Sequence, residues 1–107
     1  MTDDDIINIS KKVGAFNSRQ YNLLKLKEEC LELALIITQL ETKPKKVEET
    51  KPNELYAEIA DVTLRLFILM SSFNSEEQEK VTDFMQNKAR KYKEYLEYSQ
   101  IFKIKRI

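Results

Sequence analysis

The chain has 107 residues, which is the size of one domain with a modest hydrophobic core. Its 18 lysine and arginine residues balance 18 aspartate and glutamate residues, so no overall field attracts nucleic acid or an anionic membrane surface. The chain has no histidine and one cysteine, which excludes an internal disulfide and the usual zinc and imidazole acid-base sites. We expect Cys30 to be a small core residue and any chemistry to depend on carboxylates, lysine, arginine and an oxygen-preferring metal.

The opening of the chain and its apolar runs bear on its location. The opening "MTDDDIINIS" is acidic where a signal or transit peptide would be basic. The longest apolar runs, "LALII" and "LFILM", are too short to span a bilayer. We therefore expect a cytoplasmic protein without a membrane partner, and we do not expect nucleic acid to be its main partner.

The first half of the chain predicts two helices. With one glycine, two prolines and no alternation of strand length, the whole sequence is typical of an all-α protein. The first helix is expected from about Asp3 to Val13, with Thr2 as N-cap and Gly14 as the stop. The second follows Ser18 and continues to about Leu40. Its apolar residues recur at the spacing of a core helix: Leu23, Leu26, Leu33, Ile37 and Leu40.

The second half of this single domain, residues 1–107, predicts two more helices. Residues 41–53, "ETKPKKVEETKPN", are charged and hold both prolines, which predicts a surface loop. Asn53 is expected to cap a helix over residues 54–73, and Ser75 with Gln78 predicts a capping box for a helix that reaches about Ser99. The tail, residues 100–107, could be a strand, a helix extension or a partner-binding segment.

Apolar residues spread around the two central helices, as in "LALII" and "LRLFILM", and one small four-helix unit cannot hide them all. The sequence therefore predicts a four-helix core of helical hairpins that is completed by a homodimer or homotetramer.

Two pairs of acidic residues border the apolar stripes of these central helices. Glu29 and Glu32 share one helix face, as do Glu58 and Asp61, because residues three positions apart project together. If the two helices pack as an antiparallel hairpin, all four carboxylates converge. Such a half-buried cluster is costly without a cation, and its oxygen ligands favour magnesium, or manganese, with substrate phosphates completing the coordination. The implied substrate is a nucleotide or another polyphosphate.

The spacing alone does not identify a site, because Glu76 and Glu79 have the same spacing. This pair encloses polar residues and is followed by Lys80, so we interpret it as a solvated helix start.

Several basic residues accompany the acidic pairs. Lys88 interrupts the apolar stripe of the last helix and needs an anion, which could be a buried carboxylate or a substrate phosphate. Lys25, one turn before Glu29, has the same two interpretations. Arg65, one turn after Asp61, is expected to be a structural ion-pair partner.

The segment "EECLE" (28–32), followed by "EIAD" (58–61), resembles the EExxE and ExxD signature of all-α nucleotide pyrophosphohydrolases, in particular the MazG-like members. The lead-in "RQYNLLKLKEE" also resembles these proteins, and the similarity extends from about Arg19 to Arg90, including a late "NKARK". The resemblance implies a helical bundle that is completed by dimerisation, with some dimers pairing into tetramers.

The resemblance further implies hydrolysis of a nucleoside triphosphate between its α and β phosphates, for which positioning and charge neutralisation supply most of the catalysis. Glu28 would orient or deprotonate the attacking water, or support a metal ligand. The implied magnesium ligands are Glu29, Glu32, Glu58 and Asp61. The implied phosphate contacts are Lys25, Lys88 and Lys91.

The chain differs from the proteins that it resembles in the residues available to contact the nucleobase. It lacks the tryptophan and histidine that some of them use for this contact. Phe16, Asn17 and Tyr21 are the candidates for base contacts, and base selectivity stays open. A phosphoribosyl-ATP pyrophosphohydrolase ranks lower, because the third helix continues with the apolar "VTLRLFIL". A non-catalytic helical module that binds an acidic partner or nucleic acid through "KARKYK" and "KIKRI" is the alternative from another class, and the four intact carboxylates argue against it.

Overall fold

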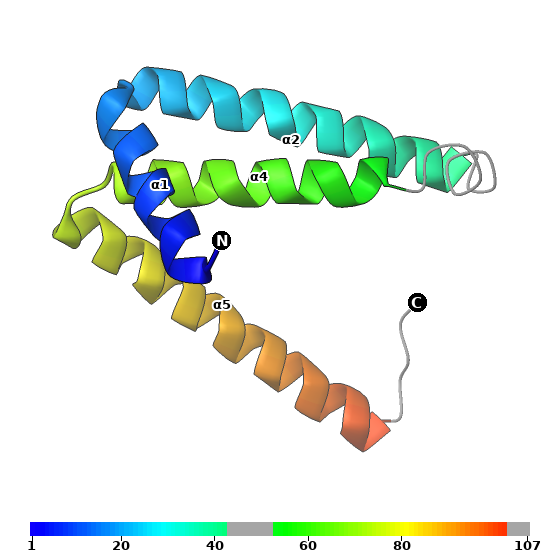
Figure 1. The fold of residues 1–107 in the computed structure, drawn as a ribbon. Coiled ribbons are helices and arrows are strands. Elements are labelled where there is room, and N and C mark those ends of the chain that lie inside the picture. The colour runs from blue at the N-terminus through cyan, green and yellow to red at the C-terminus, as the bar shows by residue number, and fades with distance from the viewer. Residues whose placement is uncertain (43–52, 103–107) are drawn as a thin grey trace. The chain divides into compact units, whose positions relative to one another are not determined.

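The computed structural model describes residues 1–42 and 53–102, and this part of the chain forms four helices and no strand, as the sequence predicts. None of these helices combines the length and the apolar character that a membrane span requires. The chain divides into two compact units, Met1–Ser72 and Phe73–Ile107. Most of the expected loop and the end of the tail lie outside the described residues. The helices in Figure 1 are α1 (Asp3–Phe16), α2 (Arg19–Thr42), α4 (Glu54–Ser71) and α5 (Ser75–Phe102).

The start of α1 is fixed by a capping box. The Thr2 hydroxyl accepts a hydrogen bond of 3.2 Å from the Asp5 backbone N–H, and the Asp5 carboxylate accepts one of 2.9 Å from the Thr2 N–H. These bonds, the backbone one first, lower the pKa of Asp5. Thr2 is the N-cap, as the sequence predicts.

The predicted stop of α1 at Gly14 is wrong, because α1 continues to Phe16 and Gly14 is buried inside the helix. A Cβ atom at Gly14 would lie 2.7 Å from the carbonyl oxygen of Ile68 and would meet the Ser71 hydroxyl, both on α4. Ser71 Oγ also donates a hydrogen bond of 3.1 Å to the carbonyl of Ser10, one turn before the glycine. The missing side chain therefore allows α1 to cross α4 closely, and it serves packing instead of a chain reversal.

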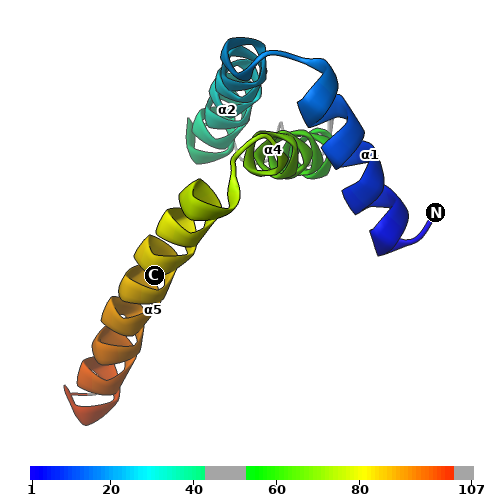
Figure 2. The same cartoon turned by 90° about the vertical axis from the view of Figure 1, so that its left-hand side faces the viewer.

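Helices α2 and α4 form the predicted antiparallel hairpin, and Figures 1 and 2 show them side by side. The predicted core positions Leu23 and Ile37 are wrong, since they are 47% and 43% exposed, and Cys30 is exposed as well. One partner helix covers only one side of α2 within this unit, which leaves these positions open. The buried apolar side chains of the described residues are Ile36, Ile68 and Leu69.

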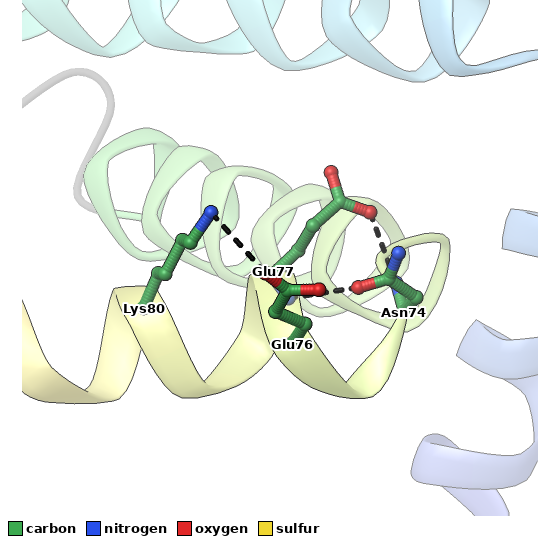
Figure 3. Close-up of polar contacts among 4 residues, drawn as sticks. All are labelled: Asn74, Glu76, Glu77 and Lys80. Atoms are coloured by element: carbon green, nitrogen blue, oxygen red, sulfur yellow. Dashed lines mark hydrogen bonds and ion pairs between the residues drawn. The ribbon is translucent and has the colours of Figure 1, made fainter.

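The caps of the later helices differ from the predictions. Asn53 occupies the N-cap position of α4 but makes no side-chain cap bond. The capping box of α5 lies one residue earlier than predicted, because Asn74 Oδ1 accepts from the Glu77 N–H at 2.8 Å and Glu77 Oε1 accepts from the Asn74 N–H at 3.1 Å. Figure 3 shows this cap and the exposed ion pair of 3.7 Å between Glu76 and Lys80, which agrees with a solvated helix start.

Candidate metal centre in the α2–α4 hairpin

Three carboxylates meet between α2 and α4. Glu29 and Glu32 project from successive turns of α2, and Glu58 projects from α4. One oxygen from each lies within 4.8 Å of the others. Asp61, the fourth predicted ligand, is exposed and outside this group, although its charge still acts on Glu29. The structure thus brings together three of the four carboxylates, which we name the carboxylate cluster.

The carboxylate cluster contains two oxygens without partners. Glu29 Oε2 and Glu58 Oε2 are both buried and accept no hydrogen bond from the described residues. Glu32 is exposed and opens the cluster to solvent. Buried acceptors without donors are costly, and an all-carboxylate donor set is typical of oxygen-preferring cations. The residues present therefore fit a magnesium or manganese ion.

The same crowding changes the acidity of the carboxylate cluster. Burial, together with the charge and side chain of Glu32, raises the pKa of Glu58 from 4.5 to about 7. Burial also raises the pKa of Glu29, with further contributions from the charges of Glu32 and Asp61. Both shifts favour protonation of the carboxylate cluster in the metal-free protein.

Lys25 and Glu28 form an ion pair beside the carboxylate cluster. Lys25 Nζ lies 3.2 Å from Glu28 Oε2 and 5.5 Å from the centroid of the Tyr21 ring. The hydrogen bond to Glu28 is the main cause of a raised pKa at Lys25, which keeps the amine charged. The candidate catalytic carboxylate and a candidate phosphate ligand are therefore bonded to each other in this state.

Arg65 differs from its predicted role. Its Nη1 atom is buried without a hydrogen-bond partner, and Arg65 takes part in no ion pair among the described residues. Arg65 is close enough to Lys25 for its positive charge to lower the pKa of that lysine, against the larger effect of Glu28. The expectation of a structural ion pair is thus wrong. Spacing alone does not show this, because the four residues between Asp61 and Arg65 are the usual spacing of a helical ion pair.

A small pocket adjoins the carboxylate cluster on the side away from Lys25. The sequence alone does not mark Leu35, Gln39 or Glu54 as site residues, although Leu35 and Gln39 follow Glu32 by three and seven residues on α2. The pocket is lined by Glu32, Leu35, Ile36, Gln39, Glu54 and Glu58.

The remaining predicted site residues lie elsewhere. Phe16 is 89% exposed at the end of α1, and Asn17 is the C-cap of that helix. Lys88 and Lys91 are exposed residues of α5, which belongs to the second unit. Lys88 lines an open apolar groove along α5 with Val81, Phe84, Met85, Ala89 and Tyr92.

No family model, no curated protein and no solved structure matches this chain. The features of this chain that bear on its function are therefore the carboxylate cluster, its two unpartnered oxygens and the basic residues beside it.

Proposed function

We propose that this protein is a magnesium-dependent nucleoside triphosphate pyrophosphohydrolase. It would convert a ribo- or deoxynucleoside triphosphate to the monophosphate and pyrophosphate, as a housekeeping enzyme of the nucleotide pool. The observation that carries this proposal is the approach of three carboxylates to within 4.8 Å, with two buried oxygens that lack donors. These residues belong to the segments that resemble the EExxE and ExxD signature.

The carboxylate cluster would hold the metal ion, with Asp61 joining from the next turn of α4. Manganese fits the same oxygen donors. When bound, the ion supplies positive charge that offsets the charge of the phosphates. The protein contributes binding and orientation, which is most of what phosphoryl transfer requires.

Lys25 and Glu28 would act on the substrate and the water. Lys25 binds a phosphate oxygen, and this contact releases Glu28 from the ion pair seen here. Glu28 then accepts a proton from the attacking water. The water oxygen forms a bond to phosphorus as the bond to the bridging oxygen breaks, and pyrophosphate leaves. No covalent intermediate with the protein is needed.

A homodimer or homotetramer would complete the bundle. Large apolar side chains are exposed on the helices of both units, and a single chain leaves them in water. Examples are Leu31, Leu35, Phe67, Phe84 and Met85.

The test is to incubate the protein with magnesium and a panel of nucleoside triphosphates, with phosphoribosyl-ATP included, and to identify the products. Monophosphate with pyrophosphate supports the proposal, and the preferred compound separates the two pyrophosphohydrolases. Diphosphate with orthophosphate would show attack at the γ phosphate and a different enzyme. No turnover of any compound would favour the non-catalytic interaction module.

Matched variants separate the carboxylate cluster from other acidic residues. Glu32→Gln keeps the size of a cluster residue and removes its charge, whereas Glu79→Gln makes the same change at an exposed position of α5. Turnover should be lost in the first variant and kept in the second. Equal loss in both would contradict the assigned site.

A further inference from the structure

The α2–α4 hairpin differs in character on the two sides of the carboxylate cluster. On α2, Lys25 lies one turn before Glu29, and on α4, Arg65 lies seven residues after Glu58. Because the two helices are antiparallel, both cations lie at the same end of the carboxylate cluster. One helical turn advances about 5.4 Å, so a short polyphosphate is long enough to reach from the carboxylate cluster to this cationic end.

The cationic end contains a hydrogen-bond donor without an acceptor. Lys25 is paired with Glu28, whereas Arg65 has a buried Nη1 without a partner and lies near the charged lysine. A buried guanidinium donor without an acceptor is costly. Guanidinium groups match phosphate oxygens well, because they offer a planar fork of donors. The missing partner is therefore best supplied by a phosphate.

The opposite end suits a different chemical group. The pocket beyond Glu32 and Glu58 includes the apolar side chains of Leu35 and Ile36 and the amide of Gln39. None of the residues that line this pocket is basic, and its carboxylates would repel a phosphate. A neutral nucleobase, with an apolar face and hydrogen-bonding edges, fits it better.

We propose that the substrate lies along the α2–α4 hairpin in one direction, with its pyrophosphate end bound by Lys25 and Arg65 and its nucleoside end directed toward Leu35, Ile36 and Gln39. The α phosphate then lies at the carboxylate cluster. This inference rests on the proposed function and adds Arg65 to the substrate-binding residues. It also places the base away from Phe16, Asn17 and Tyr21, the candidates from the sequence.

The test measures the two products separately by titration calorimetry of the full chain with magnesium. The probes are inorganic pyrophosphate and the monophosphate of the nucleotide that is hydrolysed fastest. Arg65→Gln should weaken pyrophosphate binding by about tenfold or more and leave monophosphate binding nearly unchanged, because a charged hydrogen bond is lost at one end only. Gln39→Ala should show the reverse pattern.

Two further variants serve as controls. Arg65→Lys keeps the charge but not the fork and should give an intermediate loss of pyrophosphate affinity. Lys27→Gln removes an exposed charge two residues from Lys25, on another face of α2, and should change neither affinity. Melting temperatures identify variants that fail to fold. If Arg65→Gln is one of them, Arg65→Lys and Lys25→Gln decide the question.

Three results would overturn the inference. Unchanged pyrophosphate binding in Arg65→Gln would show that Arg65 is not a ligand. Loss of monophosphate binding alone would reverse the orientation, and equal loss of both would indicate only general electrostatic attraction. Turnover by the parent protein tests the proposed function independently. An inactive parent would therefore refute the enzyme, whereas an active parent with normal pyrophosphate binding in Arg65→Gln would refute only the orientation.

Discussion

Glu29 and Glu58 lie together from opposite helices of the α2–α4 hairpin, and each has a buried carboxylate oxygen without a hydrogen-bond donor. This arrangement favours protonation in the metal-free protein, because burial and neighbouring carboxylates disfavour both charges. If the carboxylate cluster binds a metal ion as proposed, a proton and the metal ion compete for the same oxygens, and both pH and magnesium should then affect stability.

The free energy of unfolding of the metal-free protein should fall as pH rises from about 4.5 to about 7. The folded pKa of Glu58 is about 7 against an ordinary value of 4.5, so the folded state binds more protons than the unfolded state between these values. Glu29 contributes with the same sign. Asp5, whose pKa is lowered from 3.8, contributes with the opposite sign only at more acidic pH. Urea unfolding in a chelator at constant ionic strength measures the dependence.

Glu58→Gln is the control for this pH dependence, because it removes the titrating group and should flatten the curve. A parent protein whose stability is constant or rises over this window would contradict the assignment, as would an unchanged slope in the variant.

Magnesium should stabilise the parent protein much more than Glu32→Gln. A ligand at about ten times its dissociation constant adds about 1.4 kcal/mol to the state that binds it. The metal-free variant should be at least as stable as the metal-free parent, because one repelling charge is gone. Melting temperatures with and without magnesium measure both effects, and Glu79→Gln should respond as the parent does. Equal stabilisation of parent and Glu32→Gln would show that Glu32 is not a ligand.

Gly14→Ala should destabilise the protein by about 1–3 kcal/mol, although alanine favours helices more than glycine does. The added methyl group would meet Ser71 and the carbonyl of Ile68, so α1 must move away from α4. Ala15→Gly, at the exposed neighbouring position, should lose only helix propensity, about 1 kcal/mol at most. Urea unfolding distinguishes the two, and a Gly14→Ala protein as stable as the parent would refute the close crossing.

Light scattering at micromolar concentration should report a dimer or a tetramer. The reason is the apolar surface that one chain leaves exposed, including Phe67 on α4 and Phe84 on α5. A monomer at this concentration would contradict the proposed assembly.

The sequence predicts the helices well because their signals are local. The Thr2 cap and the periodicity of the central helices determine where helices form without reference to the rest of the chain. The prediction that α1 ends at Gly14 is wrong, because the sequence does not distinguish a glycine at a helix crossing from a glycine at a helix end until the partner helix is known. The cap at Asn74 was missed because Asn74–Glu77 and Ser75–Gln78 are overlapping capping patterns.

The candidate site is predictable only in part, because local sequence signals do not contain the packing between helices. Helical spacing places Glu29 beside Glu32, but the register between two helices decides that Glu58, and not Asp61, lies within 4.8 Å of both before any metal is bound. The unpartnered Nη1 of Arg65 depends on side-chain packing across the hairpin, which spacing along one helix does not contain.

The chain has only one glycine, and it lies within a helix. The described corners, from α1 to α2 and from α4 to α5, therefore turn without a residue of unusual backbone freedom. Hydrogen-bonding side chains direct them instead, because Ser18 Oγ accepts from the first turn of α2 and Asn74 Oδ1 from that of α5. The path of the chain is thus encoded chemically at its corners, where the loss of one hydroxyl or amide has more influence than a change of side-chain size.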